Sequence, residues 1–336
     1  MNGKKRHCRL AIEIMSAKSG VALIIVLWVM TLLIVISLSF SVMARTEVYS
    51  TITFKEQIIN KYLAEAGMQR AIMEIFFRNV NKNKQINFEG EELYRTDGTF
   101  YHGEIGNGYY KISINDESGK ININTMTDSS GIILDNLLVN SGVEKETADT
   151  IVDSILDWKD ADNLTRLHGA EDDYYMSLAN PYKAKNANFD SLEELLLVKG
   201  VTPEILYGNE EKPGLINFIT LYSNTSTINI NTAASEVLKA IPFMSDDDVH
   251  LIMNYRNADN TPKDGTNIQT VLAGDYAKIS QYISTSDSNV YAIEALGYLE
   301  KDNDKKGYPL KAIIILEGND RYRTLYYQSP ANIKKT

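Results

Sequence analysis

The 336-residue chain has a single cysteine, Cys8, and only four histidines. Cys8 lies in an amino-terminal segment that we expect to be removed or cytoplasmic, so the body of the protein cannot form an internal disulfide. One of the histidines, His7, lies in the same segment. The stability of the body must therefore come from packing or from a bound metal.

The sequence also lacks the patterns of the common enzyme classes. It has no Ser/His/Asp signature, no glycine-rich phosphate loop and no cysteine nucleophile in the body. Paired carboxylates such as Asp160 and Glu171 are typical of glycosidases, but that chemistry requires a defined separation and a substrate cleft. We predict that the protein is not an enzyme.

Positive charge is scarce outside the amino terminus. The formal net charge is -10, yet the first twenty residues carry +4, which leaves the remainder at -14. So acidic a body repels phosphate backbones at long range and attracts cations. Nucleic acid is therefore not an expected partner.

The segment Val21 to Met43 is 23 residues long and contains no charge. As a helix it would be roughly 34 Å long, enough to cross a hydrocarbon core of about 30 Å. A buried core helix is a poorer interpretation, because all faces of the segment are apolar. Basic residues before it and Glu47 after it place the body outside the cytoplasm by the positive-inside rule. We predict a single-pass membrane protein.

The residues before this segment do not resemble a secretory signal peptide, whose apolar region has only about 7 to 15 residues. Instead, basic residues end at Lys18-Ser19-Gly20, directly before the apolar run. A peptidase that cuts after Gly20 would leave Val21 as the first residue and the membrane helix intact. The leader begins at Met1 or, in a shorter form, at Met15.

The helical pattern continues beyond the membrane segment. Arg45 to Phe77 contains no proline, and its apolar residues recur at helical spacing, which predicts one helix from Val21 to Phe77. The strings GVALIIVLWVM at 20–30, ARTE at 44–47 and LAEAGMQRAI at 63–72 resemble the K-type minor pseudopilins of type II secretion systems. The resemblance extends over nearly the whole chain.

The resemblance implies a location, a maturation and a set of partners. The location is the inner membrane with the body in the periplasm, and the maturation is cleavage by the prepilin peptidase with methylation. The implied partners are the I- and J-type minor pseudopilins, the major pseudopilin and the inner-membrane secretion platform. The implied function is to nucleate or cap the pseudopilus for protein secretion across the outer membrane.

Ile25 makes this prediction more specific. Most pilins and major pseudopilins have a glutamate at the fifth mature position, which in that family is thought to neutralise the terminal ammonium of the neighbouring subunit; here the position is Ile25. A buried unpaired charge costs several kcal/mol. A subunit without this carboxylate fits best at the tip, although Ile25 is also compatible with a lipid-facing position in an ordinary anchor.

The rest of the chain predicts an α+β fold. Two alternating runs flank Gly106-Asn107-Gly108, a hairpin signal, and three more strands lie near the carboxyl terminus. Between them the sequence is mainly helical, so we predict a pilin-like long helix packed on a small antiparallel sheet, with an inserted all-α domain. The predicted divisions are the leader 1–20, the membrane helix 21–43, helix and first strands 44–124, the inserted helical domain 125–285, strands 286–328 and a frayed tail 329–336.

An internal repeat marks the inserted segment, because ININT occurs at 121–125, where the segment begins, and again at 228–232. These units and the segment from Phe189 resemble helix-hairpin-helix (SAM-like) modules, some of which bind DNA. The third unit keeps Lys199-Gly200, but in the second the hairpin ends in Asp246 to Asp248. We therefore predict a packing module, in which the asparagines of the repeats serve turns and caps.

The acidic segment 151–175 carries the densest chemical signal. Carboxylates without matched Arg or Lys repel one another, and a hard cation such as calcium relieves that repulsion. The spacing is not that of an EF-hand, so a solvated acidic loop is the alternative. The K-type family has calcium in its helical domain and a D-W-x-D-x-D and G-A-E-D pattern, which this chain matches at 157–162 and 169–172. The resemblance thus implies calcium, with candidate ligands Asp157, Asp160, Asp162, Glu171 and Asp172.

Two other functions remain open. A minor pilin of a type IV pilus has the same anchor, and a membrane-anchored DNA receptor would account for the repeated units and for Lys199-Gly200. Net charge argues against the DNA receptor.

Replacing Gly20 by phenylalanine tests the processing site. A bulky side chain at this position should block cleavage, so the full-length precursor accumulates in cells, and Edman sequencing or mass spectrometry identifies its amino terminus. A mature form that still begins with Val21 contradicts the predicted leader.

Overall fold

The computed structural model describes residues 4–81, 94–257, 265–299, 307–318 and 320–331. It divides into two compact units, one that ends at Ile59 and one that begins at Asn60.

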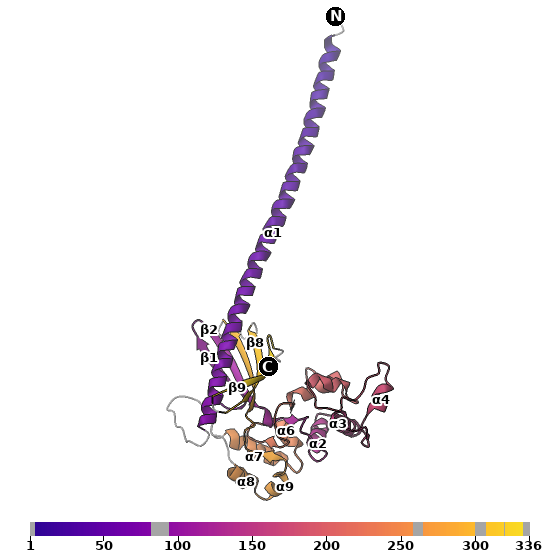
Figure 1. Ribbon diagram of the computed structural model, residues 1–336. Helices are drawn as coiled ribbons and strands as arrows, with labels where there is room; N and C mark the ends of the chain where they lie inside the picture. The colour runs from indigo at the N-terminus through magenta and orange to yellow at the C-terminus, as the bar shows by residue number, and fades with distance from the viewer. Residues whose placement is uncertain (1–3, 82–93, 258–264, 300–306, 319, 332–336) are drawn as a thin grey trace. The chain divides into compact units, whose positions relative to one another are not determined.

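The first unit is helical throughout the described residues and belongs to α1, which spans Lys4–Val80 (Figure 1). Within the part of the chain that the structure describes, α1 is the one helix long and apolar enough to cross a membrane, and none of its most apolar stretch is buried. The predicted helix is confirmed over Val21 to Phe77. It begins earlier, at Lys4 within the predicted leader, and ends three residues later, at Val80.

The second unit contains a five-stranded antiparallel sheet with the order β1-β2-β7-β8-β9 (Figure 1). Its strands are β1 (Asp97–Ile105), β2 (Gly108–Asp116), β7 (Val290–Tyr298), β8 (Tyr308–Leu316) and β9 (Tyr322–Gln328). The hairpin turns at Gly106, whose φ of 60° is in the left-handed region that glycine readily adopts. All five strands were predicted from alternation and turn signals.

One face of this sheet is covered by the carboxyl-terminal part of α1. Residues spaced three, four and seven apart form an apolar stripe on the helix that packs against apolar side chains of β2, β7 and β8. The helical side of this core consists of Ala64, Met68, Ala71, Ile72 and Ile75.

Gly297 of β7 lets the helix come this close. A Cβ atom at Gly297 would lie 2.1 Å from the carbonyl oxygen of Asn60 and 2.3 Å from the amide nitrogen of Ala64. Because both atoms belong to the backbone, neither can move aside as a side chain can. The glycine is therefore required by the helix–sheet distance.

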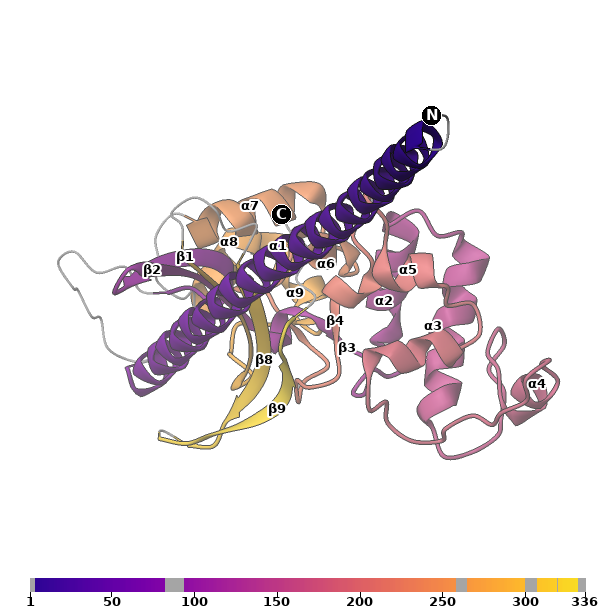
Figure 2. The ribbon, with the colours of Figure 1, turned by 90° about the horizontal axis from the view of Figure 1, so that it is seen from above.

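The described helices α2 to α9 all lie in sequence between β2 and β7, and Figure 2 shows them coloured from magenta to orange in chain order. They share a second hydrophobic core, separate from that of the sheet. Their bounds are α2 (Gly131–Asn140), α3 (Lys145–Lys159), α4 (Asp172–Met176), α5 (Pro203–Tyr207), α6 (Ser235–Ala240), α7 (Asp246–Asn257), α8 (Gly265–Leu272) and α9 (Tyr276–Ile279). The short 3-10 helices are η1 (Glu117–Gly119), η2 (Leu192–Leu197), η3 (Leu215–Asn217) and η4 (Ala273–Asp275).

Each ININT repeat begins with a two-residue parallel strand. In the first, β3 (Ile121–Asn122) pairs with β4 (Ile219–Thr220), and in the second, β5 (Ile228–Asn229) pairs with β6 (Ile283–Ser284). Asn122 and Asn229 accept hydrogen bonds from the amides two residues on, Asn124 and Asn231, at 2.8 and 3.0 Å. The predicted role in turns is thus confirmed for Asn122 and Asn229. The side chains of Asn124 and Asn231 instead donate to the carbonyls of Phe189 and Thr285, at 3.1 Å each.

Two polar contacts tie this helical segment to the sheet. Asp116, at the end of β2, accepts hydrogen bonds from the amide and hydroxyl of Ser288 at 3.0 and 2.6 Å. Arg256 of α7 lies 3.5 Å from the carboxylate of Asp97 and donates to the carbonyl of Ala233 at 2.7 Å.

The carboxyl-terminal segment differs in part from the frayed tail that we expected. Ala331 is buried, and its amide donates to the carbonyl of Pro309 in β8 at 2.8 Å. This hydrogen bond and the burial of its methyl group hold residues 329–331 against the sheet. Residues 332–336 of the predicted tail lie outside the described part of the chain.

Replacing Gly297 by alanine tests the helix–sheet contact. Overpacking typically costs about 1 to 3 kcal/mol, and here backbone atoms must move, so we expect the upper end of that range in urea unfolding. Gly274→Ala is the matched control, because a Cβ atom there meets nothing within 4 Å. Equal stability of the two variants contradicts the proposed role of Gly297.

Candidate metal centre

Three carboxylates converge beside the last turn of α3. Asp157 lies in that turn, Asp160 caps the helix, and Glu171 stands just before α4. One carboxylate oxygen from each lies within 4.8 Å of those of the other two. Two segments separated by a short loop therefore bring three of the five predicted ligands together.

The surroundings of these carboxylates are unfavourable for negative charge. Asp157 and Glu171 are buried, with exposed fractions of 0% and 3%. Asp157 and Asp160 also lie at the carboxyl end of a helix, where the helix dipole is negative. Burial raises the pKa of the Asp157 carboxyl, although hydrogen bonds from Arg166 oppose the rise.

Glu171 has no compensation of this kind. Neither of its side-chain oxygens has a hydrogen-bond partner among the residues that the structure describes. Burial, and then the charges of Asp157, Asp160, Asp162 and Asp172, raise the pKa of the Glu171 carboxyl to about 7. Burying a carboxylate without a partner costs free energy, which the binding of a proton or a cation by this side chain would lower.

Arg166 corrects one premise of the sequence analysis, which treated these carboxylates as lacking a matched cation. Its Nη1 donates to Asp157 Oδ1 at 2.7 Å and to Asp160 Oδ2 at 2.6 Å, while Nε donates to Asp128 at 2.9 Å. Arg166 is the only arginine in the acidic segment 151–175. Its presence there was the one feature of the sequence that could have suggested a counter-ion for these carboxylates. The spacing did not show that its side chain folds back over α3.

The loop between Asp160 and Glu171 approaches α3 closely at Gly169. A Cβ atom at this position would lie 1.9 Å from Asp157 Oδ2. Lys199 supports the loop from the other side, because its Nζ donates to the carbonyls of His168 and Gly169 at 3.2 and 3.0 Å. The glycine of the G-A-E-D pattern therefore makes room for the Asp157 carboxylate.

The other two predicted ligands, Asp162 and Asp172, make hydrogen bonds and ion pairs outside the carboxylate cluster. Asp162 accepts a hydrogen bond from the amide of Leu164 at 2.8 Å, and Asp172 pairs with Lys183 at 2.9 Å and accepts from the amide of Ala184. Neither belongs to the convergent group within the described residues. The sequence favours core positions for Trp158, Tyr174 and Tyr175. Trp158 and Tyr175 are core side chains, 5.1 Å apart between ring centroids, whereas Tyr174 is exposed.

The donor set fits calcium better than a softer metal. All three convergent groups are carboxylates, the hard oxygen ligands that calcium prefers, and the orphaned Glu171 side chain is a donor in need of a cation. Zinc sites use Cys or His, and His168 instead has its Nδ1 3.5 Å from Asp153. The identity of the cation stays a prediction.

The hairpins predicted to resemble DNA-binding units use their polar side chains internally. Lys199 bonds loop carbonyls, as described above. Asp246 to Asp248 form the first turn of α7 rather than the hairpin: Asp248 accepts from the amide and hydroxyl of Ser245 at 2.9 and 2.6 Å, and Asp246 pairs with Lys239. These contacts favour structural packing.

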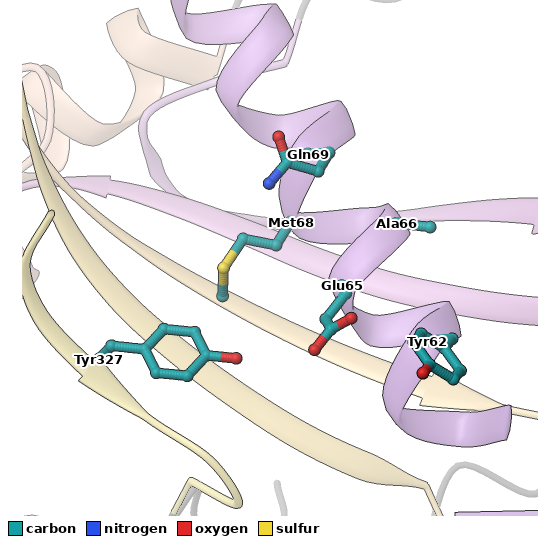
Figure 3. A pocket seen from close by; sticks show the side chains of 6 residues that line it. All are labelled: Tyr62, Glu65, Ala66, Met68, Gln69 and Tyr327. Carbon is teal, nitrogen blue, oxygen red and sulfur yellow. The ribbon is translucent and has the colours of Figure 1, made fainter. Parts of the chain in front are cut away.

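A second candidate site is a shallow groove of about 490 Å³ between α1 and β9. Figure 3 shows the Tyr327 ring pointing from β9 toward Met68 and Glu65 of the helix. The lining residues are Tyr62, Glu65, Ala66, Met68, Gln69 and Tyr327. Tyr62 and Tyr327 are 66% and 50% exposed.

Comparisons with known proteins agree with the predicted resemblance. Residues 119–208, which include the carboxylate cluster, match the family described as type II secretion system protein K. Protein K of Pseudomonas aeruginosa is 24% identical over 296 residues, 83% of this chain and 85% of that protein. Protein K of Pectobacterium carotovorum is 27% identical over 227 residues, 65% of this chain and 67% of that protein.

A solved structure has the same fold. A chain of the GspK–GspI–GspJ complex of the enterotoxigenic Escherichia coli type 2 secretion system matches with a TM-score of 0.58 and 18% identity, over 86% of this chain and 99% of that chain. Together these matches confirm the resemblance to type II secretion system protein K.

Glu171→Gln tests the electrostatics of the centre in the absence of metal. The carboxyl of the folded protein has a pKa of about 7 against an ordinary value of 4.5, so the folded state holds the proton longer and loses stability as pH rises between these values. The shift corresponds to roughly 3 kcal/mol.

In chelator, the variant should therefore gain stability relative to the natural protein between pH 5 and pH 8, as measured by urea unfolding. Asp190→Asn, at an 87% exposed carboxylate outside this loop, is the control. A difference between the natural protein and Glu171→Gln that does not change with pH contradicts the cited cause.

Proposed function

We propose that this chain, given its resemblance to type II secretion system protein K, is the minor pseudopilin at the tip of the pseudopilus. The observation that carries the proposal is the match of residues 119–208 to protein K, on a chain that also has a single long apolar helix. In this role it nucleates or caps the filament and promotes protein secretion across the outer membrane.

Maturation follows from the amino-terminal sequence. The prepilin peptidase cuts after Gly20, Val21 becomes the first residue and is methylated, and the helix stays in the inner membrane with the body in the periplasm. The helix then joins those of the major pseudopilin, near the inner-membrane secretion platform. Ile25 supports the tip, because a subunit without the fifth-position carboxylate has no charge to offer a neighbour's ammonium.

The groove between α1 and β9 supports binding to other minor pseudopilins. The similar solved chain comes from a complex with GspI and GspJ, and we propose that this chain binds its own I- and J-type partners. Exposed tyrosines such as Tyr62 and Tyr327 of its lining are typical of protein interfaces, where aromatic side chains carry much of the binding energy. The proposed occupant of this groove is the helix of a neighbouring minor pseudopilin.

Calcium supplies the third element of the proposal. Asp157, Asp160 and Glu171 would hold the ion, whose positive charge offsets their repulsion and the negative end of the α3 dipole. The loop 160–171 would then be fixed at both of its ends. In this proposal calcium has a structural role only.

Co-purification of the full-length protein with its I- and J-type partners in detergent tests the function and the groove together. The natural chain should retain both partners, and Tyr62→Ala/Tyr327→Ala should retain at least fivefold less, since each interface tyrosine contributes more than about 1 kcal/mol. Leu251→Ala, at an exposed leucine of α7, is the control. Absence of any complex with the natural chain contradicts the proposed function, whereas equal retention by the double variant contradicts the groove alone.

Thermal unfolding with and without calcium tests the ion. At a hundredfold excess over the dissociation constant, a ligand of the folded state adds about 2.7 kcal/mol, which raises Tm by several degrees. Chelation should reverse the rise, and Asp157→Asn should abolish it. Asp190→Asn, at an exposed carboxylate paired with Lys185, should leave it unchanged. If neither calcium nor chelator changes the Tm of the natural protein, the proposed calcium site is contradicted.

A further inference from the structure

The guanidinium of Arg166 lies where a cation would be held by the carboxylates. Its Nη1 is 2.7 Å from Asp157 Oδ1 and 2.6 Å from Asp160 Oδ2. Calcium binds oxygens at about 2.3 to 2.6 Å. An atom that close to both oxygens leaves no room for an ion bound to the same pair.

Charge leads to the same conclusion. Arg166 carries one positive charge against the three of Asp157, Asp160 and Glu171, so it neutralises the centre only in part. It does not reach Glu171, whose two oxygens are buried and have no partner among the described residues. The arginine thus satisfies two members of the group and leaves the third for a cation of higher charge.

We propose that Arg166 is a built-in counter-ion of the metal-free protein, which calcium must displace from Asp157 and Asp160 in order to bind. This inference rests on the calcium site proposed above. It assigns Arg166 a role that determines the affinity of the site, because every calcium ion bound replaces two charge-assisted hydrogen bonds.

The surroundings of Arg166 allow this exchange without unfolding the loop. Its Nε is held by Asp128, whose carboxylate is 77% exposed and lies outside the convergent group. Its backbone amide donates separately to the Asp157 carboxylate, at 3.2 and 3.3 Å. The side chain can therefore swing toward Asp128 and solvent while the main chain stays beside α3.

In this exchange the carboxylates have one of two counter-ions, Arg166 without metal or calcium with metal, while the loop keeps its conformation. Without metal, the arginine limits the repulsion between Asp157 and Asp160, so the fold survives chelation. With metal, Glu171 gains the partner that it lacks. Arg166 thereby lowers the affinity for calcium and protects the metal-free protein.

Isothermal titration of the full-length protein in detergent with calcium chloride tests the proposal. Arg166→Gln removes the competing charge and both charge-assisted hydrogen bonds, so its calcium affinity should rise by about tenfold or more over that of the natural chain. Arg166→Lys, which keeps a cation without the planar fork, should lie between the two. Arg323→Gln, in an exposed ion pair with Glu317, is the matched control and should not change the affinity.

Thermal unfolding in chelator gives a second measurement, in which Arg166→Gln should have a lower Tm than the natural chain. Circular dichroism checks that each variant folds. Unchanged or weaker calcium binding by a folded Arg166→Gln overturns the inference and leaves the calcium site standing. Binding by neither protein overturns both, whereas binding by the variant alone supports the competition in its strongest form.

Discussion

The helical part of the body depends on how one buried group of negative charges is neutralised. Asp157 and Glu171 are removed from water at the negative end of α3, and the repulsion between them and Asp160 acts in a medium that screens it poorly. Arg166 offsets part of that repulsion, and a divalent cation would offset more. Gly169 lies close to the Asp157 carboxylate, and Lys199 donates hydrogen bonds to the loop carbonyls. These contacts stabilise the loop only if the repulsion among the three carboxylates is offset.

This constraint connects the centre to the packing around it. Trp158 follows Asp157 directly and packs on Tyr175, so the side chains on either side of the carboxylates belong to the core of the helices. A displaced Asp157 would disturb that core as well as the loop. The sheet has a core of its own, joined to the helical segment through Asp116 and Arg256, and a long helix supplies its cover. The charged centre and the groove beside β9 thus belong to separate cores, so the two proposed roles, holding calcium and binding neighbouring subunits, use different parts of the body.

Much of this organisation is predictable from sequence because local rules govern it. The long helix follows from an uncharged run and from apolar spacing without proline, and the sheet follows from alternation around Gly106 and near the carboxyl terminus. The asparagine turns of the two repeats follow from side-chain chemistry alone. Within the centre, Asp157, Asp160 and Glu171 were among the predicted ligands. Arg166 was not recognised, because whether an arginine nine residues along the chain returns to the same helix depends on the path of the loop. For the same reason the sequence did not separate Asp162 and Asp172, which bond the backbone and Lys183, from the ligands that converge. The short 3-10 turns and Gly297 reflect tertiary distances that spacing does not encode.

The most direct test of this account is a crystal structure of the protein grown with calcium, with anomalous scattering used to locate the ion. The account predicts one calcium within about 2.6 Å of oxygens from Asp157, Asp160 and Glu171, with the Arg166 guanidinium moved toward Asp128. A centre without an anomalous peak at saturating calcium, with Nη1 still bonded to both aspartates, would contradict it.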